Sequence, residues 1–123
     1  MLRLIGGIVA GIVVWGIVVT LLNFGLRYGM PGYGAVEKAM LFTVPMMAAR
    51  LSISAVSSLV SGYAAAAIGR RQMAAVAAGV IILLLFLPVH YMIWDKFPIW
   101  YHLTFLTSLP VLSIVGGRFA RTD

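Results

Sequence analysis

Four long stretches of this 123-residue chain carry no formal charge, and they constrain the fold more than any other feature. The stretches cover residues 4–26, 51–69, 73–94 and 97–117. An α-helix rises about 1.5 Å per residue, so roughly 20 apolar residues cross the hydrocarbon core of a bilayer. The sequence therefore predicts an all-α integral membrane protein, a four-helix transmembrane bundle that forms a single domain over residues 1–123.

The overall composition excludes several classes of function. Hydrophobic residues make up 63% of the chain and charged residues 10%, whereas soluble domains are about half apolar and about a quarter charged. The net charge of +6 comes from basic residues at segment ends, and the sequence lacks the basic cluster that would bind nucleic acid. The chain has no cysteine, which excludes disulfides, thiolate metal sites and a cysteine nucleophile.

The predicted transmembrane helices cover about residues 4–26, 45–69, 73–94 and 98–117. We expect the first to be retained, because its apolar run exceeds the roughly 7–15 residues of a signal-peptide core. Residues 35–43 predict a short interfacial helix between the first two transmembrane helices, with Glu37 and Lys38 exposed. Pro88 should kink the third helix near its end and free a backbone carbonyl there.

Small residues mark two faces where helices can pack closely. Gly7 and Gly11 have the G-x-x-x-G spacing, which lets a second backbone approach, either from the same chain or from another subunit. The second predicted helix carries a row of small residues at four-residue steps: Ser54, Ser58, Gly62 and Ala66. Serine hydroxyls can form hydrogen bonds between helices, so we favour helix packing over a polar channel lining.

The distribution of cations predicts the orientation in the membrane. With four crossings, both termini and the turn at residues 70–72 lie on one side, which carries five arginines. The five are Arg3, Arg70, Arg71, Arg118 and Arg121, and the opposite side carries Arg27, Lys38 and Lys96. Because basic residues accumulate on the cytoplasmic side, we predict cytoplasmic termini, in what we expect to be a bacterial inner (plasma) membrane.

Candidate binding residues gather at the predicted outer end of the bundle. No acidic residue lies within the four stretches, so the intramembrane carboxylate common in proton-coupled transporters is missing. His90 and His102 lie six residues on either side of Lys96, so a helical hairpin would place the two imidazoles at similar depth. The candidate ligand- or partner-binding set comprises Arg50, His90, Trp94, Asp95, Tyr101 and His102.

Three interpretations of this cluster remain open. In the first, Arg50 pairs with Asp95 or Glu37 or reaches lipid headgroups, while the histidines bond to backbone carbonyls or interfacial water. In the second, the cluster binds an anionic lipid headgroup or an acidic group of a partner. In the third, His90 and His102 are the ligands of a haem b or of a metal ion.

Aromatic residues surround the same end: Phe86, Tyr91, Trp94, Phe97, Trp100, Tyr101 and Phe105. They form either the usual interfacial belt or the wall of a cavity for a quinone or a lipid tail. A catalytic set of Ser108, His102 and Asp95 is rejected, because Ser108 lies nearly two helical turns from His102. No catalytic residue is predicted.

The leading functional prediction is a non-enzymatic accessory or scaffold subunit that binds other membrane proteins or lipids, or associates with itself. The first alternative is a small oligomeric transporter or channel. The second alternative is an electron-transfer subunit that holds haem b or a quinone at the outer end. Under the leading prediction the chain needs no cofactor and no metal ion.

Overall fold

The computed structural model describes residues 2–29 and 44–120, and most of them lie in four long α-helices. The elements are α1 (Leu2–Gly29), α3 (Val44–Gly69), α4 (Gln72–Met92), the 3₁₀ helix η1 (Trp94–Lys96) and α5 (Ile99–Arg118). Each long helix is long and apolar enough to span a membrane, and the described residues contain no strand. The prediction of an all-α chain with four such helices is confirmed. The predicted interfacial helix at residues 35–43 lies outside the described residues.

The helix boundaries follow from proline chemistry and turn geometry. Pro45 occupies the first turn of α3, where the missing N–H of proline costs no intrahelical hydrogen bond. α4 continues through Pro88 and ends at Met92, two residues before the predicted end, and η1 then turns the chain toward α5. Arg70, between α3 and α4, has a φ of 60°, a left-handed conformation that fits a tight turn.

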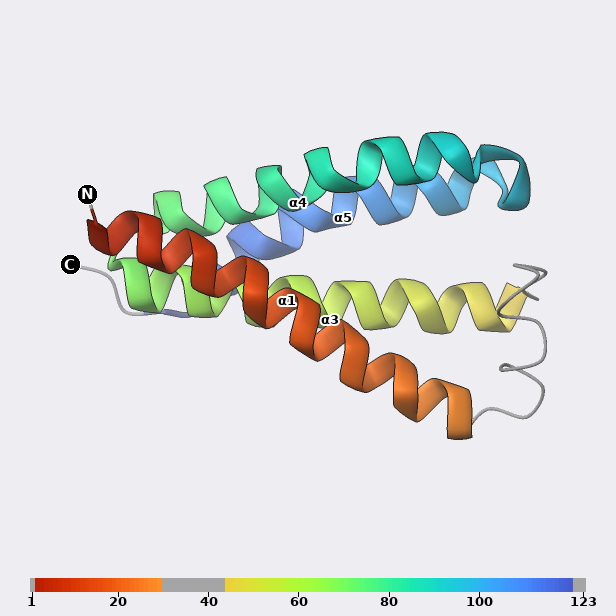
Figure 1. Ribbon diagram of the computed structural model, residues 1–123, viewed down its shortest axis with the longest axis horizontal. Coiled ribbons are helices and arrows are strands. Elements are labelled where there is room, and N and C mark those ends of the chain that lie inside the picture. Colours follow the sequence, from red (N-terminus) through yellow and green to blue (C-terminus); the bar gives the residue numbers. More distant parts are fainter. Residues whose placement is uncertain (1, 30–43, 121–123) are drawn as a thin grey trace.

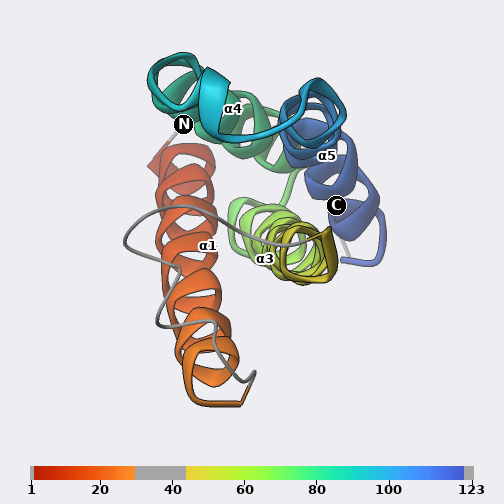
Figure 2. The ribbon, with the colours of Figure 1, turned by 90° about the vertical axis from the view of Figure 1, so that its right-hand side faces the viewer.

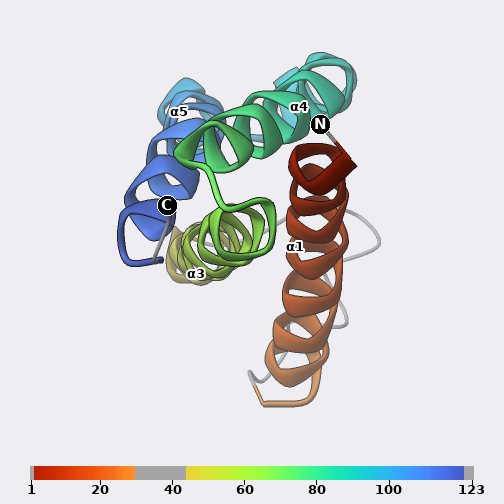
Figure 3. The ribbon, with the colours of Figure 1, turned by 90° about the vertical axis from the view of Figure 1, so that its left-hand side faces the viewer.

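α3 lies at the centre of the arrangement. α1 packs mainly on α3, which packs in turn on α5, and α4 lies beside α5. The N-terminal end of α1 and the C-terminal end of α5 lie at one end of the molecule together with the α3–α4 turn, and the α4–α5 hairpin lies at the other end (Figure 1). The two end views show α1 and α5 on opposite sides of α3 (Figures 2 and 3).

Glycines allow the closest contacts between helices. A Cβ added at Gly7 would lie 2.5 Å from the Ala65 carbonyl oxygen, and one at Gly11 would lie 2.8 Å from the Ala65 Cβ. The G-x-x-x-G face of α1 therefore packs on α3 of the same chain, which answers the question that the spacing alone left open. Gly62 of α3 packs closely against the backbone of Ser113 in α5.

From these glycine contacts toward the end opposite the termini, α1 diverges from α3 (Figures 1 and 2). Two clusters of buried side chains fill the interior in this half: Trp15 with Ile82, Phe105 and Leu109, and Met46 with Met47, Phe97 and Tyr101. The divergence leaves space beside Trp15 that these clusters do not fill, and the candidate site lies there.

Candidate functional site

A cavity of about 200 Å³ lies between the diverging half of α1 and the other three helices. Its lining comprises Trp15, Val19, Asn23, Arg50, Ile53, Ser54, Phe86, Tyr101 and Phe105. A second hollow of about 330 Å³ shares Asn23 and Arg50 with it and is also lined by Thr20, Phe24 and Arg27. The two hollows together are called the Arg50 cavity below. Pockets that hold small molecules typically measure about 300–1,000 Å³, and the second hollow reaches this range even without the volume of the first.

The lining of the Arg50 cavity changes from aromatic to polar along α1. At the inner end, the Phe86 ring lies between Trp15 and Phe105, with ring centroids 5.1 and 5.3 Å apart. The lining residues nearer the end of α1 include three polar side chains: Thr20, Asn23 and Arg27. An apolar interior with a polar mouth matches the two parts of an amphipathic molecule.

Arg50 is half-buried and lies where the two hollows meet. Its Nε donates a hydrogen bond of 3.1 Å to the hydroxyl of Tyr101, a buried residue of α5. The Tyr101 ring stacks on Phe97 with centroids 4.3 Å apart, so the acceptor is held firmly. Arg27 and Arg50 contribute guanidinium groups to the lining, and none of the described lining residues is acidic.

Ser54 differs from the other buried serines of α3. The hydroxyls of three neighbours are hydrogen-bonded, to a carbonyl or to the Trp15 indole: Ser57, Ser58 and Ser61. The Ser54 hydroxyl is fully buried, lines the cavity and has no hydrogen-bond partner among the described residues. A buried hydroxyl without a partner is energetically costly. A polar ligand group in the cavity would therefore gain a bond that the described part of the chain does not supply.

His90 of α4 and His102 of α5 are in direct contact next to Tyr101. Their Nδ1 atoms are 2.6 Å apart, and both side chains are buried. The His102 Nε2 lies 3.1 Å from the carbonyl oxygen of Trp94, so the same ring also ties the hairpin to α5. The His90 ring stacks on Tyr101, which connects the pair to the residue that holds Arg50. The sequence expectation of two imidazoles at similar depth agrees with this contact.

If both rings are neutral, these hydrogen bonds set their tautomers. A carbonyl oxygen only accepts, so His102 carries its proton on Nε2 and offers Nδ1 as an acceptor. His90 then donates to it from its own Nδ1. Two nitrogens that bind one metal ion at about 2 Å each are about 3.3 Å apart in a tetrahedral site and about 4 Å apart in axial positions. The distance of 2.6 Å between the Nδ1 atoms fits a hydrogen bond instead, and this bond joins α4 to α5.

Trp94 and Asp95 lie outside the Arg50 cavity. Trp94 stacks on His102 with ring centroids 4.5 Å apart, and both Trp94 and Asp95 are exposed at a separate hollow of the hairpin. The predicted set is thus divided, with Arg50 and Tyr101 in the cavity and the two histidines beside it. Pairing of Arg50 with Asp95 or with Glu37, which is outside the described residues, stays a prediction.

Sequence reasoning missed the contribution of α1 to the site. Trp15, Val19 and Asn23 follow one another at four-residue steps, so they lie along one face of the helix. Arg27 continues this row one helical turn further, Thr20 lies beside it, and both line the mouth. The sequence feature that could have indicated this lining is Asn23, a polar residue in a long apolar helix. It lies on the same helix face as Trp15 and one turn before Arg27.

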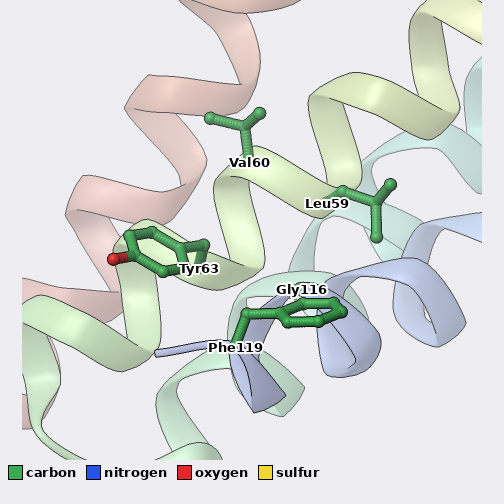
Figure 4. A pocket seen from close by; sticks show the side chains of 5 residues that line it. All are labelled: Leu59, Val60, Tyr63, Gly116 and Phe119. Atoms are coloured by element: carbon green, nitrogen blue, oxygen red, sulfur yellow. The ribbon is translucent and has the colours of Figure 1, made fainter. Parts of the chain in front are cut away.

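A further hollow of about 300 Å³ lies between α3 and α5 near the end that carries the termini (Figure 4). Its lining comprises Leu59, Val60, Tyr63, Gly116 and Phe119. The Tyr63 hydroxyl points away from the other labelled residues, so the wall is apolar (Figure 4). Lipid chains are sufficient to cover such a surface, and the hollow offers no polar group that would select a ligand.

Comparison of the chain with protein-family models, with curated proteins and with solved structures finds no match. Among residues 2–29 and 44–120, no group of three or more histidine, cysteine, aspartate or glutamate side chains is placed to hold a metal ion. The Arg50 cavity and the chemistry of its lining are therefore the features from which a function can be inferred.

Proposed function

We propose that this chain is a non-enzymatic accessory or scaffold protein of the membrane that binds a lipid in the Arg50 cavity. The observation that supports this proposal is the amphipathic lining of the cavity, with the Trp15 and Phe86 rings inside and Arg50 near the mouth. A lipid tail can lie against the rings while its polar part reaches the arginine. A bound lipid would also fill the space between the diverging ends of α1 and α3.

The distribution of arginines supports an orientation with the termini in the cytoplasm. The N-terminal end of α1, the α3–α4 turn and the C-terminal end of α5 lie together in space (Figure 1). This end carries more basic residues than the end with the α4–α5 hairpin, as expected for the cytoplasmic side. The Arg50 cavity then opens toward the outer leaflet of a bacterial inner membrane.

The use of the polar side chains supports a binding role rather than catalysis. His90 and His102 bond to each other and to the Trp94 carbonyl oxygen, so they join helices. Ser108 donates its hydroxyl to the Phe105 carbonyl oxygen of its own helix. An activated nucleophile would instead be hydrogen-bonded to a general base.

The two alternative functions receive less support from the geometry. A channel through the serine row of α3 would need hydroxyls that face a continuous path, but Ser58 and Ser61 bond to α1 and fill a helix contact. An electron-transfer role for His90 and His102 would need their ring nitrogens on a cofactor, and the short Nδ1 contact occupies one nitrogen of each ring. Both alternatives stay predictions.

The test is a tagged purification from native membranes in mild detergent, followed by lipid analysis, a visible spectrum and mass spectrometry of co-eluting proteins. We expect about one tightly held lipid per chain, a colourless preparation and a co-purifying membrane protein. The variant Ile53→Trp, which fills the cavity, should lose the lipid. The control Leu84→Trp, on an exposed position of α4, should keep it.

Three results would contradict the proposal. A lipid content that is equal in the wild-type protein and Ile53→Trp would place the lipid outside the cavity. A visible absorption band that is lost in His90→Ala would favour the electron-transfer alternative. Solute flux from the pure protein in liposomes would favour the transporter.

A further inference from the structure

A single buried hydroxyl, that of Ser54, indicates which part of a lipid the Arg50 cavity recognises. Building on the lipid binding proposed above, we infer that Ser54 selects a glycerolipid whose acyl chains are joined through esters. The serine hydroxyl donates a hydrogen bond to an ester carbonyl oxygen of this lipid. Ser54 is then a specificity-determining residue, and the ligand class is an ester-linked glycerolipid.

Ser54 lacks a partner because of the register between α1 and α3. The two helices run in opposite directions (Figure 1), and two serines of α3 bond to α1. Ser61 donates to a backbone carbonyl oxygen, and Ser58 accepts from the Trp15 indole. The next turn of α1 brings Val19 to the level of Ser54, and a valine side chain has no hydrogen-bonding group. The Ser54 hydroxyl is therefore left for a ligand in the cavity that both residues line.

The other polar side chains of the lining already have interactions. Thr20 and Asn23 each donate to a carbonyl oxygen of their own helix. The Nε of Arg50 donates to the Tyr101 hydroxyl. Among the described residues, only the Ser54 hydroxyl is a buried side-chain polar group without a hydrogen-bond partner. Recognition by this hydroxyl requires no uncompensated charge in the lining.

An ester carbonyl is the lipid group that matches this hydroxyl. A buried hydroxyl without a partner is costly, and an acceptor oxygen removes that cost. The carbonyl oxygens of an ester-linked glycerolipid are acceptors, and the ester itself contains no donor that could satisfy them. Water is scarce in the hydrocarbon region, so the hydroxyl and the carbonyl each supply the bond that the other lacks there.

The order of groups along the cavity matches the order of groups along such a lipid. Tyr101, which bonds to Arg50, is two residues from the start of α5, so this part of the mouth lies about 3 Å from the end of that helix. Ser54 lies one turn deeper, about 6 Å beyond Arg50 along the axis of α3. The Trp15 indole bonds to Ser58, a further turn inward. The headgroup can thus occupy the mouth while the ester reaches Ser54 and the acyl chains lie against the aromatic rings.

The experiment compares two lipids that differ only in how the chains are linked. The probes are dioleoyl phosphatidylcholine, which has two esters, and its diether analogue, in which a methylene group replaces each ester carbonyl. Binding to the full chain in detergent is measured by native mass spectrometry. We expect the ester lipid to bind about two- to tenfold more tightly, which is the effect of one neutral hydrogen bond.

Two serine variants separate the loss of this bond from misfolding. Ser54→Ala should bind the ester lipid more weakly by the same factor and bind the diether analogue as the wild-type protein does, which shows that the variant is folded. Its thermal stability in lipid-free detergent should be unchanged or raised, because a hydroxyl without a partner is removed. Ser57→Ala is the matched control, since its hydroxyl is equally buried but bonds to the Ile53 carbonyl oxygen. It should keep the preference of the wild-type protein.

A quinone also carries carbonyl oxygens, so decylubiquinone is added as a competitor. We expect it to leave the ester lipid bound at equal concentration, because its headgroup has no polar part to occupy the mouth. Displacement by decylubiquinone in the wild-type protein that is lost in Ser54→Ala would overturn the ester as the source of the carbonyl.

The remaining failures are distinguishable. Equal affinity of the wild-type protein for the two phosphatidylcholines, or a preference that persists in Ser54→Ala, would overturn the selection by Ser54 and leave lipid binding intact. Failure of the wild-type protein to bind either lipid, or binding of both that is unchanged in Ile53→Trp, would contradict the proposed function itself.

Discussion

Trp15 of α1 donates its indole N–H to the hydroxyl of Ser58 in α3 at a distance of 3.1 Å. This bond lies between the close glycine contact at Gly11 and the Arg50 cavity, where the two helices begin to diverge. It is buried, so water cannot replace it without cost. The pair therefore sets the inner boundary of the cavity.

A double-mutant cycle measures the strength of this bond. Trp15→Phe and Ser58→Ala should each lower the free energy of unfolding in detergent, and the coupling energy between them should be about 0.5–1.5 kcal/mol. Measured hydrogen bonds between transmembrane helices have about this strength. Strictly additive effects would mean that the two side chains do not form a bond in the protein.

Adjacent glycines of α1 provide a matched pair for the helix contact. Gly7→Ala should lower the free energy of unfolding by about 1–3 kcal/mol, because the new Cβ overlaps the backbone of α3. Gly6→Ala has open space around its Cβ and should leave stability unchanged or raise it by up to about 1 kcal/mol through helix propensity. Equal effects of the two substitutions in chemical denaturation would contradict the packing of α1 on α3.

The contact between α3 and α5 is even tighter at Gly62. Gly62→Leu should destabilise the bundle by about 3 kcal/mol or more, since the added side chain meets the Ser113 backbone and cannot be accommodated by a rotamer change. Gly25→Leu, at an exposed position with nothing near its Cβ, is the control. An unchanged melting temperature for Gly62→Leu would mean that this face of α3 points to lipid.

The histidine pair makes a spectroscopic prediction. Nitrogen NMR of the labelled protein near neutral pH should find His102 protonated on Nε2, and His90 protonated on Nδ1 with its proton shared toward His102. Trp94 should be tolerant of replacement by phenylalanine, because its backbone carbonyl oxygen, not its indole, accepts the bond from His102. Equal populations of both tautomers in each ring would contradict the arrangement.

The fold could be predicted from the sequence because the physical signal is strong and local. Each uncharged stretch is long enough to cross a bilayer, and the ends of such stretches are marked by Arg27, Arg70 and Asp95. The spacing of Gly7 and Gly11 also indicated a contact face, but it could not identify the partner helix. That partner depends on which helices lie side by side, and the structure gives α3.

The candidate site was only partly predictable, for a geometric reason. A hairpin brings His90 and His102 together through local chain connectivity. Their six-residue spacing on either side of Lys96 was therefore sufficient to predict two imidazoles at similar depth. The Arg50 cavity instead combines α1 with α3, α4 and α5, and it exists because α1 crosses α3 at an angle. Crossing angles are not encoded in the local pattern, so Asn23 could not be assigned to the same site as Arg50.

Photo-crosslinking from inside the cavity tests whether a lipid occupies the space beside Arg50. A benzoylphenylalanine at Ile53, which lines the cavity, is compared with one at Leu84, which is exposed on α4. In a membrane of mixed lipids, we predict that the Ile53 probe forms lipid adducts whose composition differs from the bulk composition, whereas the Leu84 probe reports the bulk composition. Adducts at Ile53 with the same lipid composition as those at Leu84, or none with lipid, would contradict a lipid site at Arg50.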